Sequence, residues 1–210
     1  MSDAKVELWL VRHGETAWSL SGAHTSFTDI PLTDRGRERA VELRNYLQTK
    51  PFAAVLVSPR QRAQETARIA GFGEVMQTED DLVEWNYGES EGKTTKEMRE
   101  KYGDPAWSVW TRPIVGGETV EQVGDRADAV IARALALAKA PAAGQPEPGG
   151  TQRVALFAHA HILRILAARW IGLPATGGKS FAFGTGAVSV LGFERETRVI
   201  AHWNREFDGD

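Results

Sequence analysis

The sequence contains no cysteine, which excludes disulfide frameworks, thiol nucleophiles and cysteine-based zinc or iron–sulfur sites. It also lacks an apolar run of transmembrane length, and its N-terminal segment lacks the apolar core of a signal peptide. We therefore expect a cytoplasmic protein with no membrane-embedded part.

An excess of basic charge is missing as well. The 25 Lys and Arg residues are outnumbered by 28 Asp and Glu residues, so the net charge is −3, and no long basic run occurs. This balance argues against a general nucleic-acid surface but is compatible with one locally cationic pocket. The 210 residues, 42% of them apolar and 25% charged, are ordinary for one globular domain with a substantial core.

Three short apolar runs predict buried strands at residues 6–11, 52–57 and 153–158. Helical spacing or capping residues predict helices after Thr33, from Ser58-Pro59 to about residue 70, over 118–139 and over 161–172. Segments 186–194 and 197–204 flank a short polar turn and predict a closing hairpin.

The alternation of strands and helices predicts a single α/β domain over residues 1–210, a three-layer sandwich with a mostly parallel central sheet. Residues 139–150 are rich in Pro and Gly and show no periodicity, which is typical of a flexible surface loop rather than a domain boundary.

Each of the three predicted strands is followed by positively charged or titratable side chains. Arg12 and His13 follow the first strand, Arg60 and Arg62 the second, and His159 the third. The carboxyl ends of parallel strands meet at one edge of a sheet, where helix N-termini add free N–H groups. Arginine offers bidentate donors and histidine can bind or attack phosphorus, so a phosphate site is predicted.

Simpler interpretations apply to each feature taken alone. A single Arg-His pair after a strand is usually a surface turn, and Arg60 or Arg62 could be solvated helix charges. His159 and His161 could form a metal pair, but no third histidine or acidic cluster lies nearby in sequence. The convergence of three strand ends favours the anion site, and we expect no metal and no cofactor.

Five motifs in order resemble those of the histidine phosphatase superfamily, also called phosphoglycerate mutase-like. They are "VRHGET" (11–16), "SPRQRAQETA" (58–67), "LVEWNYGESEG" (82–92), "GGET" (116–119) and "FAHAHILR" (157–164). The resemblance covers almost the whole chain and implies a small helical cap inserted at about residues 77–118. It also makes "GGET" the counterpart of a loop on the substrate side.

The resemblance implies a role for each matching residue. His13 would be the nucleophile that becomes phosphohistidine, and Glu84 the acid/base carboxylate. Arg12, Arg62 and His159 would hold the phosphoryl oxygens. This assignment agrees with the chemistry, because attack by one imidazole nitrogen requires the other to keep the proton, and the leaving alkoxide must gain one.

Further residues in these motifs or in the stretch that follows the first of them are candidates for binding phosphate or substrate, namely Ser19, His24, Thr25, Arg60, Ala160 and His161. Ala160 departs from the glycine that relatives usually have after the second histidine. It would keep a backbone N–H donor there, or would strain the site if the position needs a positive φ. His24 and Thr25 could instead be structural turn residues, and His161 a polar helix start.

The expected function is metal-independent hydrolysis of small phosphomonoesters, with sugar phosphates and bisphosphates as candidate substrates. A cofactor-dependent phosphoglycerate mutase is the enzymatic alternative, and a catalytically silent phosphate-binding protein is the third. A homodimer is compatible with the resemblance. Four aromatic residues near the predicted cap would pack it or touch the leaving group: Trp85, Tyr87, Trp107 and Trp110. Arg112 is either a solvated charge or a contact for a second anion.

Overall fold

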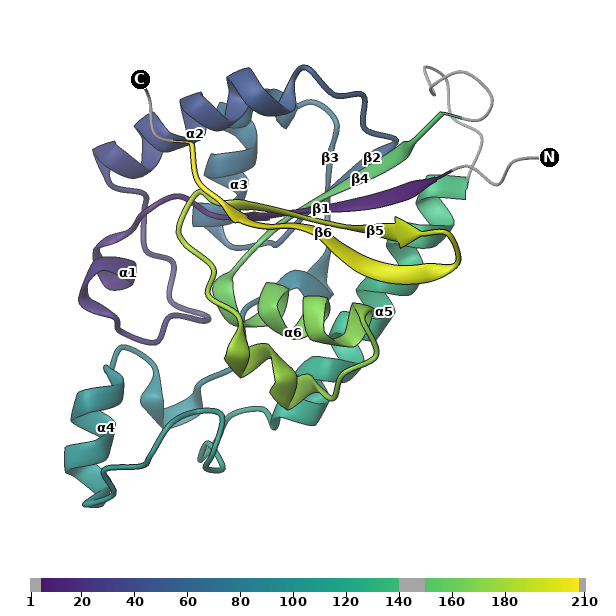
Figure 1. Ribbon diagram of the computed structural model, residues 1–210. Coiled ribbons are helices and arrows are strands. Elements are labelled where there is room, and N and C mark those ends of the chain that lie inside the picture. The colour runs from purple at the N-terminus through teal and green to yellow at the C-terminus, as the bar shows by residue number, and fades with distance from the viewer. Residues whose placement is uncertain (1–4, 140–149, 208–210) are drawn as a thin grey trace.

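The computed structural model describes residues 5–139 and 150–207, which form a six-stranded sheet with helices on both faces (Figure 1). The strands are β1 (Val6–Arg12), β2 (Ala54–Val57), β3 (Met76–Thr78), β4 (Gln152–Ala158), β5 (Val188–Glu194) and β6 (Thr197–Arg205). Their order is β3-β2-β4-β1-β5-β6. The first four run parallel, β5 runs antiparallel to β1, and β6 pairs antiparallel with β5. The predicted mostly parallel α/β fold is confirmed.

The described helices are α1 (Ala17–Ser21), α2 (Asp34–Leu47), α3 (Gln61–Ala67), α4 (Thr95–Tyr102), α5 (Val120–Lys139) and α6 (Ala160–Trp170). Short π or 3-10 turns are η1 (Arg68–Phe72), η2 (Asp80–Leu82), η3 (Gly88–Ser90) and η4 (Ala175–Ser180). None of the helices in the described part of the chain is long and apolar enough to cross a bilayer.

The two faces of the sheet are covered by different helices. In Figure 1, α2 and α3 lie above the sheet, while α5 and α6 lie below it. Side chains alternate along β1, so Trp9 packs with the α2 and α3 side and Leu10 with the α5 and α6 side. Strands buried on both faces are expected to be apolar, as β2 is over its whole length and β4 is over residues 154–158.

The loop after β1 lies against the start of α2. Thr33 caps this helix as predicted, because its side chain accepts a hydrogen bond from the Gly36 N–H. A Cβ on Gly14 would lie 2.5 Å from the Gly36 carbonyl oxygen. The residue after His13 must therefore be small for α2 to pack beside the loop that carries His13.

The predicted start of the next helix is wrong. Arg60 rather than Ser58 is the N-cap of α3, and its side chain makes no capping hydrogen bond. The Ser58 hydroxyl is used instead in a hydrogen bond with His159. The helix continues past Ala67 only as the turn η1, which contains Gly71 at a φ of 91°.

The remaining helix and hairpin predictions agree with α5, α6, β5 and β6, with small differences at the ends. The sequence did not indicate β3, a three-residue edge strand with two exposed polar residues, or the five-residue helix α1. Positions 140–149 of the predicted loop lie outside the described residues.

Residues 79–118 run from the end of β3 to the start of α5 and carry α4, which Figure 1 shows at the lower left, away from the sheet. Trp85, Tyr87 and Trp107 from this segment are buried in the same apolar cluster as the α5 and α6 side of the sheet. These aromatic side chains therefore anchor the segment against the sheet and its helices. This agrees with the first of the two roles expected for them, packing of the predicted cap.

Candidate active site

The carboxyl ends of β2, β4 and β1 lie side by side in the sheet, and the predicted residues meet there. Arg12 is the last residue of β1, His159 directly follows β4, and Arg62 lies in the first turn of α3 after β2. Beside them is a cavity of about 300 Å³. Its lining includes seven of the predicted residues besides Arg12, namely His13, Ser19, His24, Thr25, Glu84, Ala160 and His161.

His13 is buried, and its two ring nitrogens have different environments. Nδ1 lies 2.7 Å from the Gly14 carbonyl oxygen, which can only accept, so Nδ1 carries a proton. Nε2 has no partner among the described residues and is not enclosed, so it is open to the cavity. Burial, together with the nearby charges of Arg62 and Arg12, lowers the pKa of His13 well below its ordinary value. The ring is therefore neutral with a free nucleophilic nitrogen.

His159 is held in the opposite tautomer. Arg62 donates from Nε to Nδ1 of His159 over 3.1 Å, so the ring proton sits on Nε2 and is donated to the Ser58 hydroxyl over 2.8 Å. Burial and the charge of Arg62 lower the pKa of His159 well below its ordinary value. Its ring centre lies 5.2 Å from that of His13, although His159 does not line the cavity.

Arg62 is fully buried behind the cavity wall. Its two terminal nitrogens donate to the carbonyl oxygens of Thr25, Ser26 and Thr28 over 3.1–3.2 Å. Burial is the main cause of its lowered pKa, which the negative charge of Glu84 partly offsets. The loop carrying these carbonyls is in turn fixed by Glu91, whose carboxylate accepts from the backbone N–H groups of residues 26 and 28.

Arg12 differs from Arg62 in lining the cavity. Its Nη1 donates to the Phe183 carbonyl oxygen over 2.5 Å, whereas its buried Nε has no hydrogen-bond partner. Burial lowers the pKa of Arg12 to about 10, so the guanidinium remains charged at neutral pH. Its Nη2 has no partner among the described residues and is not enclosed, so this nitrogen, rather than the enclosed Nε, is the donor available to an anion in the cavity.

Glu84 is positioned by the N-terminal end of α6. Its Oε1 accepts from the backbone N–H groups of Trp85 and Ile162, and its Oε2 accepts from that of His161, each over 2.9 Å. Oε1 therefore has both lone pairs engaged, while Oε2 keeps one for the cavity. The free N–H groups at the start of α6 thus fix the orientation of this carboxylate.

The "GGET" segment does not line the cavity, contrary to the substrate-side position that the resemblance implies. The Glu118 carboxylate accepts from the Asn86 backbone N–H and forms an ion pair with Arg126. The backbone carbonyl oxygen of Glu118 accepts from the Trp85 indole N–H. The segment therefore holds the turn that carries Glu84.

Ala160 is the first residue of α6 and does not have a positive φ. Its N–H donates to no other described residue, so the alanine keeps a free donor without strain.

Ser19 completes the capping box of α1 by exchanging hydrogen bonds with Thr16. Thr25 donates from its hydroxyl to the Ala23 carbonyl oxygen.

The structure does not bring Arg60 or Arg112 to the cavity lining. Arg60 stacks 4.8 Å from the centre of the Phe27 ring, although its charge still contributes to lowering the pKa of His159. Arg112 pairs with Asp104 over 2.8 Å.

Arg164, which the sequence interpretation did not single out, does line the cavity. Its guanidinium lies 4.9 Å from the centre of the Trp110 ring and donates to the carbonyl oxygens of Gly178 and Lys179. Its position one turn along α6 from His161 is a signal that helical spacing could have given.

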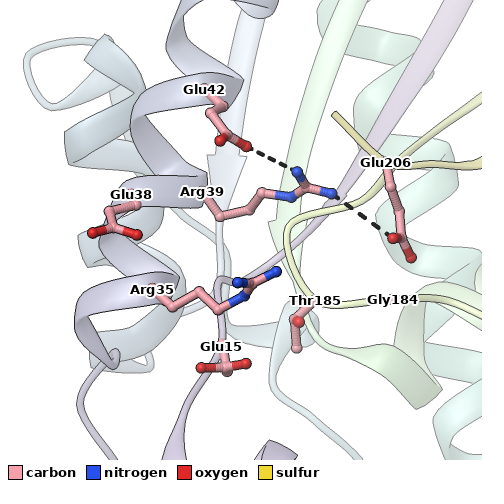
Figure 2. Close-up of a pocket in the computed structure, with 8 residues that line it drawn as sticks. All are labelled: Glu15, Arg35, Glu38, Arg39, Glu42, Gly184, Thr185 and Glu206. Carbon is pink, nitrogen blue, oxygen red and sulfur yellow. Dashed lines mark hydrogen bonds and ion pairs between the residues drawn. The ribbon is translucent and has the colours of Figure 1, made fainter. Parts of the chain in front are cut away.

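A second cavity, of about 480 Å³, opens at the start of α2 and is shown in Figure 2. Its walls are mainly Glu and Arg side chains, and Arg39 pairs there with Glu42 and Glu206. It contains none of the predicted site residues. Within residues 5–139 and 150–207, no group of three or more His, Asp or Glu side chains is arranged to hold a metal ion.

The profile of the histidine phosphatase superfamily (branch 1) matches residues 8–206. An acid phosphatase of Mycobacterium tuberculosis is 40% identical over 197 residues, which cover 92% of this chain and 90% of the relative. A sedoheptulose 1,7-bisphosphatase of Saccharomyces cerevisiae is 34% identical over 187 residues, 78% of this chain and 67% of the relative. A solved structure of an open reading frame from Mycobacterium tuberculosis is 38% identical, with a TM-score of 0.83 over 95% of this chain and 97% of its own.

The chain therefore belongs to the histidine phosphatase superfamily. Its phosphatase relatives make it a phosphoric monoester hydrolase that acts on a small-molecule phosphate.

Proposed function

We propose that the protein hydrolyses small phosphomonoesters in two steps through a phosphohistidine at His13. In the first step Nε2 of His13 forms a bond to phosphorus, and the ester oxygen leaves with the bonding electron pair. Glu84 gives a proton to that oxygen from Oε2, so that a neutral alcohol departs. In the second step Glu84 takes a proton from water, whose oxygen attacks phosphorus, and His13 leaves with its original electron pair.

The observation that carries this proposal is the hydrogen bond from Nδ1 of His13 to the Gly14 carbonyl oxygen. It leaves the reactive nitrogen unprotonated and open to the cavity. Arg12 and the Ala160 N–H supply donors for the phosphoryl oxygens, and Arg62 adds positive potential from behind the wall. These residues supply donors, nucleophile and acid without a metal ion.

The proposal is tested by phosphate release from p-nitrophenyl phosphate with and without a chelator. We expect release that the chelator does not change, and an acid-labile, base-stable phosphoenzyme that His13→Ala abolishes. His202→Ala on the exposed strand β6 is the matched control and should retain both. Absence of release, or its loss with chelator, would contradict metal-independent hydrolysis. Conversion of 3-phosphoglycerate to its 2-isomer without phosphate release would instead identify a mutase.

We further propose sugar phosphates and sugar bisphosphates as substrates. The yeast relative named for a sugar bisphosphate supports this class, as does the second cation of the cavity, Arg164. Arg164 forms no salt bridge with a described carboxylate, so its charge is available to a second anionic group on the substrate.

A further inference from the structure

The cavity contains two histidines that neither hydrolytic step uses. His24 and His161 come from distant parts of the chain, yet both line the cavity and both pack against Tyr87. The ring centre of Tyr87 lies 5.0 Å from that of His24 and 5.7 Å from that of His161. The hydrogen bonds of these three side chains determine what each imidazole offers to a bound molecule.

His24 offers a hydrogen-bond acceptor. Its Nδ1 lies 2.6 Å from the Lys93 carbonyl oxygen, and because a carbonyl oxygen can only accept, Nδ1 carries the proton. Burial lowers the pKa of His24, which keeps the ring neutral at neutral pH. Its Nε2 therefore has a lone pair, bonds no described residue and is not enclosed, so the lone pair is accessible from the cavity.

His161 offers a donor. The Tyr87 hydroxyl oxygen lies 2.5 Å from Nδ1 of His161 and has no other partner among the described residues. Tyr87 is 1% exposed, and burial raises its pKa well above the ordinary value, so its hydroxyl stays protonated. Because Nδ1 of His161 is the acceptor within reach of this hydroxyl among the described residues, we infer that the hydroxyl donates to Nδ1. Burial also lowers the pKa of His161. The single proton of this imidazole then sits on Nε2, which is accessible in the cavity wall.

We propose that His161 and His24 form a donor–acceptor pair that recognises hydroxyl groups of the leaving alcohol, which makes polyhydroxylated phosphomonoesters the preferred substrates. Tyr87 is the positioning residue that sets the tautomer of His161. A hydroxyl group both accepts and donates, so a polyol can satisfy both imidazoles, whereas an alkyl chain offers a hydrogen-bond partner to neither. This inference rests on the hydrolysis proposed at His13.

The tautomers can be observed directly, without any activity. Ring-nitrogen NMR of the protein labelled with ¹⁵N-histidine distinguishes a protonated from an unprotonated nitrogen. We expect the proton of His161 on Nε2 and that of His24 on Nδ1. Tyr87→Phe, which removes only the hydroxyl, should shift His161 toward the Nδ1-protonated form and leave His24 unchanged. A His161 proton on Nδ1 in the unaltered protein would overturn the assignment.

The recognition is tested with sorbitol 6-phosphate and n-hexyl phosphate, which share a six-carbon chain and a primary leaving oxygen but differ in hydroxyl groups. We expect kcat/KM for sorbitol 6-phosphate to exceed that for n-hexyl phosphate by about 100-fold, roughly tenfold for each of two hydrogen bonds. In His161→Leu this ratio should fall about tenfold, whereas His161→Gln, which keeps a side-chain N–H, should retain most of it. Tyr87→Phe should lower it by roughly threefold or more because the donor is then present only part of the time.

Hydrolysis of p-nitrophenyl phosphate by the unaltered protein distinguishes a failure of the recognition proposal from a failure of the proposed hydrolysis at His13. If that ester is cleaved but sorbitol 6-phosphate has no advantage, the recognition proposal is overturned and the hydrolytic one stands. The same conclusion follows if the advantage persists unchanged in Tyr87→Phe and His161→Leu. If neither ester is cleaved and no phosphohistidine forms, the proposed function fails and the inference fails with it.

Discussion

The Ser58 hydroxyl accepts a hydrogen bond from Nε2 of His159 over 2.8 Å, so the residue that follows β2 fixes the histidine that follows β4. The other ring nitrogen of His159 accepts from Arg62. The orientation of this imidazole is therefore set by residues from two different strand ends, and both partners are fully buried.

Replacing Ser58 with Ala should leave the Nε2–H group of His159 without an acceptor in a dry environment. We expect a loss of about 1–3 kcal/mol in the free energy of unfolding, together with lower phosphatase activity because the His159 ring is no longer fixed. Urea unfolding measures the first effect and release of p-nitrophenol the second. Ser21→Ala is the control, since its exposed hydroxyl bonds only the Trp18 carbonyl oxygen and its loss should cost less than about 0.5 kcal/mol. Equal stability of the two variants would contradict the role of Ser58.

Replacing Glu84 with Gln should slow hydrolysis of alkyl phosphates by about 10²–10⁴-fold, because the amide cannot give the alkoxide a proton. p-Nitrophenolate leaves without protonation, so its release in the first turnover should persist. The second step still needs a base, and phosphohistidine should therefore accumulate. Rapid mixing should show a burst of p-nitrophenol equal to the enzyme concentration, followed by a slow steady rate. Steady turnover without a burst would argue that another group activates water.

Acid pH should destabilise the protein in the absence of phosphate. The pKa values of His13, His159 and His161 lie well below the ordinary value in the folded state, and that of His24 is also lowered, mainly because these rings are buried. The unfolded chain therefore binds protons below about pH 6.5 that the folded chain does not, and stability present above that pH is lost as the pH falls toward the lowered values. Each histidine contributes about 1.4 kcal/mol per pH unit within that window.

Urea unfolding at pH 7.5, 6.0 and 5.0 in phosphate-free buffers checks this dependence. His161→Gln should reduce the slope by about one proton, whereas His202→Gln, at an exposed position of β6, should not change it. A free energy of unfolding that stays constant or rises between pH 6.0 and 5.0 would contradict burial of these histidines in the neutral form.

Replacing Arg164 with Met should selectively impair substrates that carry a second anionic group. We expect kcat/KM for fructose 1,6-bisphosphate, relative to that for fructose 6-phosphate, to fall roughly tenfold or more, as for loss of one charge-assisted hydrogen bond. Arg112→Met is the matched control, because Arg112 pairs with Asp104 outside the cavity lining. If both variants change the ratio equally, Arg164 has no specific contact with the second anion.

The strands and helices of the fold could be predicted from the sequence because short segments carry the signals for them. Apolar runs marked β1, β2 and β4, and the cap at Thr33 and the helical spacing before Lys139 marked α2 and α5. The three-residue strand β3 carries no such signal, since it is stabilised by pairing with β2 at the sheet edge. The prediction that Ser58 caps the next helix was wrong. A serine after a strand suits an N-cap, but in the folded protein the Ser58 hydroxyl bonds His159 instead.

The sequence by itself determined which residues form the site. Parallel strands bring Arg12, His13 and His159 to one edge of the sheet whatever the details of packing. What only the tertiary structure decided is which atom of each side chain is free. The Gly14 carbonyl leaves Nε2 of His13 for attack, and the N-terminus of α6 leaves one lone pair on Glu84. In the recognition that we propose, Tyr87 decides which nitrogen of His161 carries the proton. Such choices depend on hydrogen bonds between residues far apart in the chain, and for this reason spacing in the sequence does not reveal them.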